Sequence, residues 1–177
     1  VGNIVAIKNT GGYLLCCHSE NAAVIKKLRI KKNRPNKPFA VLFPSLEFLQ
    51  NDLKLNEFQL KSLISTERPI NIIPLENYKG KIALNAVAPG LNQLGVMLPY
   101  SGILQLLANE INFPIIATSG NIHSSPIIGN NAEAFEKLKH VADYFVQHNL
   151  EISHPQDDSV VKFSAKFNQQ VLFRRAR

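Results

Sequence analysis

A cluster of cations on a stiff segment is the first feature of the sequence that suggests chemistry. Residues 31–43, K-K-N-R-P-N-K-P-F-A-V-L-F, begin with four cations within seven residues. Pro35 and Pro38 stiffen the segment by fixing φ, and the apolar run that follows is typical of a buried strand. Cations on a rigid bend suit a polyanion such as the phosphates of a nucleotide, although most charge runs are solvated loops. The cations of this basic bend, residues 31–38, are Lys31, Lys32, Arg34 and Lys37.

The second candidate is the sequence T-S-G-N, residues 118–121, which follows an apolar run. Ligands of open α/β sheets bind beyond the carboxyl ends of strands. Small side chains around a glycine allow backbone N–H groups to reach phosphate oxygens. An ordinary strand-exit turn has the same composition, so the motif alone does not choose between structure and function. The candidate residues are Thr118, Ser119 and Asn121.

Two further candidates lie near the end of the chain. Asp157 and Asp158 precede Ser159 and a Val-Val strand, and paired carboxylates can bind Mg²⁺ beside phosphates. A turn with solvated acids is the simpler interpretation of Asp157. The run R-R-A-R, residues 174–177, is by itself typical of an exposed basic terminus. The sequence has no G-x-x-x-x-G-K-[ST], G-x-G-x-x-G or G-x-S-x-G motif, so a nucleotide pocket would combine these separate segments.

Alternating strand-like and helix-like segments predict the elements that position these residues. Capping residues predict the helix starts, and strands that follow one another without a helix indicate a mixed sheet in an α/β layered domain. The apolar strand 114–118 is expected at the centre of the sheet. Expected strands are 3–8, 12–17, 39–43, 70–75, 94–98, 114–118, 143–146, 159–163 and 170–173. Expected helices are 20–30 after Ser19, a short one after Ser45, one opened by Asn56 and Gln59, 103–111 after Ser101, and one opened by Asn130 and Glu133.

Length and composition narrow the classes of protein. The 177 residues fit one domain with a full core, and no apolar run approaches the roughly 20 residues of a membrane span. A formal net charge of +7 favours anionic ligands such as nucleotides or nucleic acid. The adjacent Cys16 and Cys17 are expected on opposite faces of a strand, reduced and half-buried, in a cytoplasmic protein. No histidine shows metal-ligand spacing, and loop or surface positions are expected for His18, His123, His140, His148 and His154.

Six blocks in order resemble one family. They are G-G-Y-L-L-C at 11–16, L-R-I-K-K-N-R-P-N-K-P-F-A-V at 28–41, A-P-G-L-N-Q-L-G-V-M-L-P-Y at 88–100, T-S-G-N, D-D-S-V-V at 157–161 and R-R-A-R. Together they are similar to the YrdC-like domain of HypF-type carbamoyltransferases, which are hydrogenase maturation proteins. The resemblance implies a YrdC-like fold, a three-layer α/β arrangement (α+β in some schemes) with a twisted mixed sheet, flanking helices and a concave basic face. It also implies a single domain over 1–177, and the start inside a strand-like run indicates a piece of a longer protein.

The resemblance further implies an activity and partners. The activity is ATP-dependent formation of carbamoyl-adenylate from a carbamoyl group derived from carbamoyl phosphate, with release of pyrophosphate and with ATP and Mg²⁺ as cofactors. The implied partners are an acylphosphatase domain, zinc-finger modules and a Kae1-like domain of the same protein, and HypE as acceptor. Two alternatives stay open: a divergent nucleotide- or double-stranded-RNA-binding module, and a relative of threonylcarbamoyl-adenylate synthases.

Family roles transfer to matching positions of this sequence. Lys32 and Arg34 match the family's K-x-R motif, which binds the triphosphate, and Lys37 matches the lysine that follows this motif in the family. The T-S-G-N and D-S-V-V blocks match nucleotide contacts, and the final arginines match residues on the far side of the nucleotide. The sequence departs from the family at Leu14, where His is common, at His18, where Asp is common, and at Leu150, where Arg is common. The implied nucleotide-site residues are Lys32, Arg34, Lys37, Thr118, Ser119, Asn121, Asp158, Ser159, Arg174 and Arg175.

Overall fold

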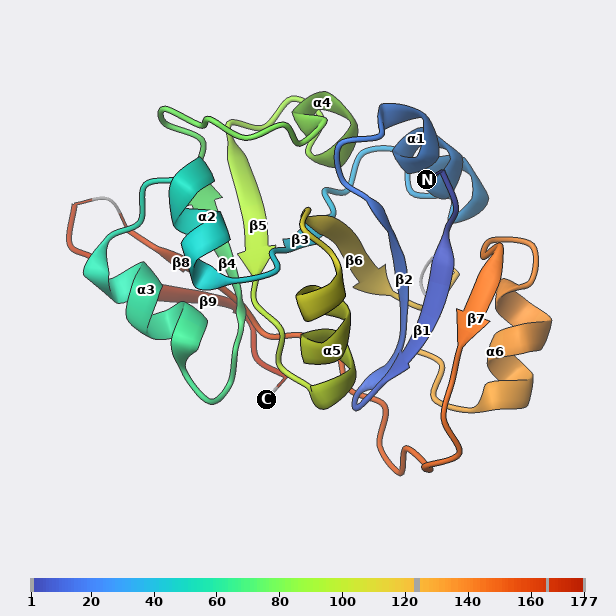
Figure 1. Cartoon of the computed structure of the whole chain (residues 1–177). Helices are drawn as coiled ribbons and strands as arrows, with labels where there is room; N and C mark the ends of the chain where they lie inside the picture. Colours follow the sequence, from blue (N-terminus) through green and yellow to red (C-terminus); the bar gives the residue numbers. More distant parts are fainter. Residues whose placement is uncertain (1, 123–124, 165, 177) are drawn as a thin grey trace.

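One mixed, twisted sheet organises the chain. The computed structural model describes residues 2–122, 125–164 and 166–176, and within them nine strands lie in the order β7-β1-β2-β6-β3-β5-β4-β8-β9 (Figure 1). The strands are β1 (Val5–Asn9), β2 (Gly12–His18), β3 (Ala40–Leu42), β4 (Ile70–Pro74), β5 (Gln93–Met97), β6 (Ile115–Ser119), β7 (Tyr144–Val146), β8 (Val160–Phe163) and β9 (Gln170–Arg174). The helices are α1 (Ala22–Lys31), α2 (Leu46–Asp52), α3 (Glu57–Ile64), α4 (Leu84–Val87), α5 (Gly102–Glu110) and α6 (Asn131–Leu138).

Strand pairing confirms the expected mixed sheet. β3 runs parallel to β5, β4 to β8 and β1 to β7, whereas β6 is antiparallel to both of its neighbours, β2 and β3. Four of the five residues of β6 are buried. A strand that is apolar on both faces needs cover on both faces, and the predicted central position of this segment is confirmed.

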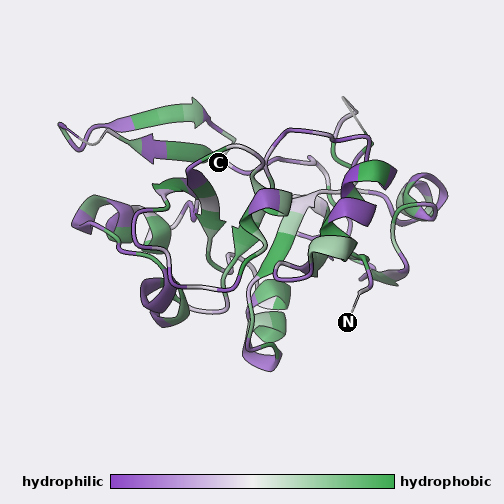
Figure 2. Cartoon of the chain, turned by 90° about the horizontal axis from the view of Figure 1, so that it is seen from above, coloured by the Kyte–Doolittle hydropathy of each residue, from purple (hydrophilic) through white to green (hydrophobic). Residues whose placement is uncertain are grey.

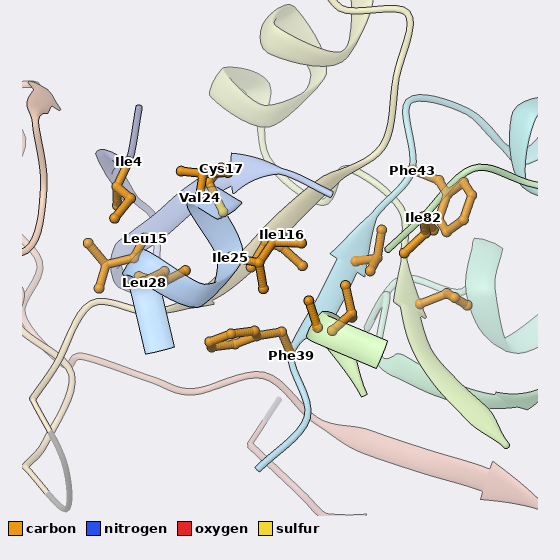
Figure 3. Packing of buried hydrophobic residues seen from close by; sticks show 14 of the residues in the cluster. Ile4, Leu15, Cys17, Val24, Ile25, Leu28, Phe39, Phe43, Ile82 and Ile116 are labelled. Atoms are coloured by element: carbon orange, nitrogen blue, oxygen red, sulfur yellow. The ribbon is translucent and has the colours of Figure 1, made fainter. Parts of the chain in front are cut away.

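The sheet is covered on both faces, which confirms the three layers. Side chains of a strand alternate between faces, so Leu15 and Cys17 join the larger apolar cluster while Leu14 and Cys16 join the smaller one. The larger cluster also holds buried residues of α1, α2, α3, α4 and α6, and the smaller one packs under α5. Figure 3 shows Val24, Ile25 and Leu28 of α1 beside Leu15 of β2 and Ile116 of β6 in the larger cluster. Both cysteines are buried rather than half-buried. Burial raises the pKa of both thiols, that of Cys17 to about 12, which leaves them protonated and unreactive.

Most helices begin where a side chain caps the first turn, as the sequence predicted. Ser45, Ser101 and Asn130 each accept a backbone N–H three residues on, and Asn56 with Gln59 forms the expected capping box. The predicted cap at Ser19 is wrong. The Ser19 hydroxyl is buried and donates to the Pro114 carbonyl at 2.6 Å, so Asn21 caps α1 instead. Among the described residues, no helix has the length and apolar character needed to cross a membrane.

Candidate functional site: a cationic face of the sheet

The basic bend is held in place by Arg29, which sequence analysis did not single out. Its side chain is only 8% exposed, and Nε and Nη2 donate to the carbonyls of Ala86 and Val87 at 2.7 and 2.9 Å. Nη1 donates to three carbonyls of the bend itself, those of Arg34, Pro35 and Lys37. Burial lowers the pKa of Arg29, yet five carbonyls satisfy the guanidinium. The sequence did contain one indication that Arg29 is buried, because it lies four residues after Ile25, on the buried face of α1.

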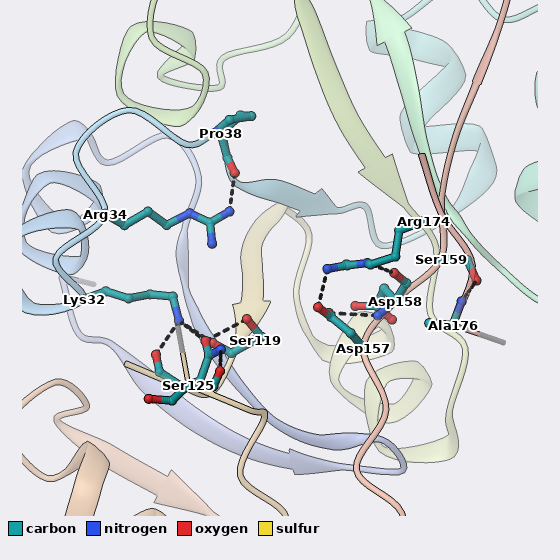
Figure 4. Close-up of polar contacts among 11 residues, drawn as sticks. Lys32, Arg34, Pro38, Ser119, Ser125, Asp157, Asp158, Ser159, Arg174 and Ala176 are labelled. Carbon is teal, nitrogen blue, oxygen red and sulfur yellow. Dashed lines mark hydrogen bonds and ion pairs between the residues drawn. The ribbon is translucent and has the colours of Figure 1, made fainter. Parts of the chain in front are cut away.

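Lys32 joins the basic bend to the T-S-G-N segment. The side chain is 3% exposed, and Nζ donates to the backbone oxygens of Ser119 and Asn121 at 2.6 and 2.5 Å and to Asn121 Oδ1 at 2.6 Å (Figure 4). Three acceptors match the three N–H groups of an ammonium. Burial and then the positive charge of Arg34 lower the pKa of Lys32 to about 7, and the charge of Asp157 opposes this shift. Lys32 is therefore in one cluster with residues that lie 87 and 89 positions further along the chain.

The backbone of T-S-G-N is committed to internal hydrogen bonds. Sequence analysis left open whether this segment binds phosphate or is an ordinary strand-exit turn. Gly120 N–H donates to Tyr13 O at 2.5 Å and Asn121 N–H to Ser119 O at 3.0 Å, so a phosphate could reach these two N–H groups only if those bonds opened. A Cβ on Gly120 would lie 2.6 Å from Tyr13, so this close approach explains the glycine. Ser119 Oγ lies 2.9 Å from Asn121 Oδ1. Thr118 is buried within β6, where it pairs with Leu15 of β2.

Arg34 forms one wall of the site and Asp157 with Arg174 forms the other (Figure 4). Arg34 is half-buried, donates to the carbonyls of Lys37 and Pro38, and lies 4.9 Å from the centroid of the Phe39 ring. Burial, with a further contribution from Arg29, lowers its pKa to about 10, while the charge of Asp157 acts in the opposite direction.

Asp157 is not the solvated acid that the sequence suggested. It is half-buried and ion-paired with Arg174 Nη1, while Arg174 Nε donates to the Asp158 carbonyl at 2.7 Å. Asp158 itself is buried. Lys37 is exposed, and its charge contributes to the lowered pKa of Lys32. Cations from two distant segments, the basic bend and the end of β9, thus lie around the carboxylate of Asp157, which favours an anionic ligand.

Small side chains form the floor between the two walls. Ala40, Gly95 and Ala117 are neighbours on β3, β5 and β6, on the sheet face that α5 covers further along. A Cβ on Gly95 would lie 3.1 Å from Ile70 Cγ2. Ile70 pairs with Val160, which in turn pairs with Arg174. Gly95 itself pairs with Ile72, so its contact with Ile70 is diagonal. This diagonal contact connects the Ala40 end, beside the basic bend, through Ile70 and Val160 to Arg174.

Two of the predicted nucleotide-site residues, Ser159 and Arg175, do not face the floor. Ser159 is buried and its Oγ accepts the Ala176 N–H at 3.0 Å. Ser159 and Arg175 both line a cavity of about 580 Å³ between α3 and the β8–β9 hairpin. Because successive residues of an extended chain point to opposite sides, Arg174 reaches the floor and Arg175 does not.

The described residues offer no preformed metal centre: no group of three or more His, Cys, Asp or Glu side chains among them is placed to hold an ion. Of the expected loop or surface histidines, His18 instead ends β2 and stacks on Phe113 with ring centroids 4.0 Å apart. His123 lies outside the described residues.

Comparison with known proteins places this architecture in a family. The Sua5/YciO/YrdC family, described as "Telomere recombination", matches residues 1–176. The chain belongs to this Sua5/YciO/YrdC family. As a YrdC-like domain, it is 38% identical over 177 residues to the carbamoyltransferase HypF of Synechocystis, covering all of this chain and 23% of that protein.

Solved structures agree with this assignment. A full-length HypF in a phosphate- and nucleotide-bound form superposes with a TM-score of 0.92 at 41% identity, over 99% of this chain and 27% of the other. YciO of E. coli, at 16% identity, has a TM-score of 0.81 over 99% of this chain and 84% of the other, and shows the fold alone. The YrdC-like domain described here therefore spans about a quarter of the HypF proteins it matches and corresponds to their YrdC module.

Proposed function

We propose that this YrdC-like domain forms carbamoyl-adenylate from ATP and a carbamoyl group derived from carbamoyl phosphate, as one module of a HypF-type carbamoyltransferase. The observation that supports this most directly is the convergence of Lys32, Arg34 and Arg174 around one low floor of the sheet. The similarity to HypF, one structure of which is nucleotide-bound, supports a nucleotide as the anion.

The chemistry suits a site with cations and no nucleophile. A carbamate oxygen attacks the α-phosphorus of ATP, a new P–O bond forms, and the bond to the β-phosphate oxygen breaks so that pyrophosphate leaves with its electron pair. Such a transfer needs positioning and charge neutralisation more than covalent participation. Arg34 and Arg174 supply charge from opposite sides of the floor, and Lys32 fixes the Ser119–Asn121 segment between them.

Mg²⁺ would enter as the MgATP complex. Asp157 is the carboxylate that electrostatically faces Lys32 and Arg34, and Mg²⁺ in nucleotide sites is usually held by one or two carboxylates together with the phosphates and water. When bound, the ion would neutralise phosphate charge. Asp157 could take part only after its ion pair with Arg174 loosens.

The remaining steps of the proposed pathway belong to other parts of a HypF-type protein. An acylphosphatase domain would release carbamate from carbamoyl phosphate, and a Kae1-like domain would pass the carbamoyl group to HypE. The YrdC-like domain would then be the activating step between a supply step and a transfer step.

The test is the exchange of labelled pyrophosphate into ATP with Mg²⁺ and ammonium bicarbonate, which supplies carbamate. We expect exchange that depends on carbamate and disappears in Arg34→Ala, while calorimetry shows saturable MgATP binding to the native chain. Exchange that instead requires threonine with bicarbonate would identify a threonylcarbamoyl-adenylate synthase. The absence of exchange together with salt-sensitive binding of double-stranded RNA would replace the proposal by the RNA-binding alternative.

A further inference from the structure

The β8–β9 hairpin leaves a five-residue strand with an apolar middle at the edge of the sheet. β9 is last in the strand order, and among the described residues no strand pairs with its outer side. Val171, Leu172 and Phe173 are 47%, 49% and 62% exposed, and Figure 2 shows the hairpin projecting from one side of the molecule, with most of β9 in the hydrophobic colour. Exposed edges are normally shortened, charged or covered, because their free N–H and C=O groups pair with other chains. The middle of β9 has no charge and no proline.

A cavity lies along the same hairpin. It has a volume of about 580 Å³, with Phe58 of α3 and Phe163 of β8 in its lining and their ring centroids 6.3 Å apart. Leu172 of β9 also lines it. The cavity therefore offers a pocket with an apolar part, formed by Phe58, Phe163 and Leu172, beside the edge strand. Strand addition uses this combination: backbone pairing for affinity and pockets for alternate side chains.

Charge indicates what kind of segment fits. Lys61 and Arg175 line the cavity, and Glu67 is the one acidic residue in that lining. Lys166, in the hairpin connection, adds a further cation 5.2 Å from the Phe167 ring. The whole chain has a formal net charge of +7, so pairing β9 with a second copy would bring two positively charged surfaces together. These positive charges would attract an acidic segment and would repel a second copy of the chain.

We propose that β9 and this cavity form a docking site for an extended, acidic segment of a partner protein, which adds as a further strand to the sheet. Its acidic side chains would meet Lys61 and Arg175, and an apolar side chain at alternate spacing would enter the cavity beside Leu172. This site faces away from the cationic floor, because Arg175 lines the cavity whereas Arg174 pairs with Asp157. The proposal is therefore independent of nucleotide binding.

The experiment uses synthetic peptides and the ¹⁵N-labelled chain. The probe is acetyl-Thr-Glu-Thr-Phe-Thr-Glu-Thr-amide, which places both Glu side chains and the Phe side chain on one face of a strand. There are two matched peptides: one has Lys in place of every Glu, and the other is the acidic peptide N-methylated at alternate residues. We expect the acidic peptide alone to shift the amide signals of β9 and to slow their hydrogen exchange. Leu172→Lys, and the double variant Lys61→Glu with Arg175→Glu, should each weaken binding about tenfold or more. Leu106→Lys, at a residue of α5 that is 69% exposed, is the matched control and should bind as the native chain does.

Several outcomes would overturn the proposal. Equal binding of the lysine peptide would remove the charge argument, and equal binding of the N-methylated peptide would remove strand addition without requiring any variant to fold. Absence of binding by the acidic peptide would also refute it. If light scattering shows a dimer that Leu172→Lys dissociates, the face belongs to a second copy. If a single-stranded RNA binds there and the acidic peptide does not, the face belongs to nucleic acid.

Discussion

Lys32 binds Asn121 at two points: its Nζ lies 2.5 Å from the backbone oxygen of Asn121 and 2.6 Å from Oδ1. A third bond, to Ser119 O, completes the donors of the ammonium. Lys32, the lysine of the K-x-R block, therefore has a structural role: it holds the backbone at the carboxyl end of β6 in place. A phosphate oxygen that contacts Lys32 has to replace one of these carbonyl oxygens.

We predict that nucleotide binding takes up a proton near neutral pH. The pKa of Lys32 is lowered to about 7, and a bound polyphosphate would raise it, because an opposite charge favours the ammonium. Affinity should therefore be constant below pH 7 and fall by up to about tenfold per unit as pH rises above 7, until the pKa of the complex is reached. Calorimetry of MgATP in buffers of different ionisation enthalpy measures the uptake.

Lys32→Met is the control for this pH effect, because ATP also titrates near pH 7. The variant should bind more weakly and lack the part of the pH dependence that belongs to Lys32. If native chain and variant show the same proton uptake, Lys32 does not change its protonation on binding.

We predict that Arg34→Ala weakens MgATP binding more than Lys31→Ala does. Arg34 Nη1 has no hydrogen-bond acceptor among the described residues, whereas Nε and Nη2 are held by Lys37 O and Pro38 O. Lys31 instead reaches toward Val141 O at 3.3 Å. Loss of a charge-assisted hydrogen bond costs about 2 kcal/mol, or roughly 30-fold in affinity. Titration calorimetry compares the two variants, and equal losses would mean that the basic bend acts as a diffuse patch.

Features fixed by neighbouring residues were predictable from the sequence. The caps at Ser45, Asn56 and Ser101 depend on bonds within one helical turn, and the apolar run of β6 indicated its central place. Ser19 shows the limit of this reasoning, because a contact with Pro114, 95 residues away, overrides its local preference.

The site was predictable in part for the same reason. Family resemblance named Lys32 and Ser119, yet only the fold shows that one binds the other. Arg29 escaped notice because two of its acceptors belong to α4, 57 and 58 residues further on. Arg175 was grouped with Arg174 because the sequence places them together, whereas the alternation of an extended chain separates them.

We predict that Arg29→Met lowers the free energy of unfolding by about 1–3 kcal/mol, the usual cost of leaving buried hydrogen-bonding groups without a partner. Five carbonyls would lose the Arg29 donor. Of these, Val87 O keeps the Phe39 N–H and Lys37 O keeps Arg34 Nε as a second donor. Arg29→Lys should not restore stability, since an ammonium cannot match the planar fork of a guanidinium. Urea denaturation measures the effect, with Lys26→Met on the exposed side of α1 as the control. A loss as small as that of Lys26→Met would show that water replaces the guanidinium.

The floor itself can be tested with Gly95→Val. A Cβ there meets Ile70 Cγ2 at 3.1 Å, and we expect the two further methyl groups of valine to raise the floor beside the neighbouring Ala40. MgATP affinity should fall by about tenfold or more while the free energy of unfolding changes by about 1 kcal/mol, a typical value for a substitution that intrudes on a partly open site. Gly102→Val is the matched control, because a Cβ at Gly102 meets no atom within 4 Å. Calorimetry and urea denaturation of both variants separate the two effects. If Gly95→Val binds MgATP as the native chain does, the nucleotide does not lie on this floor, and the cations that surround it serve another anion.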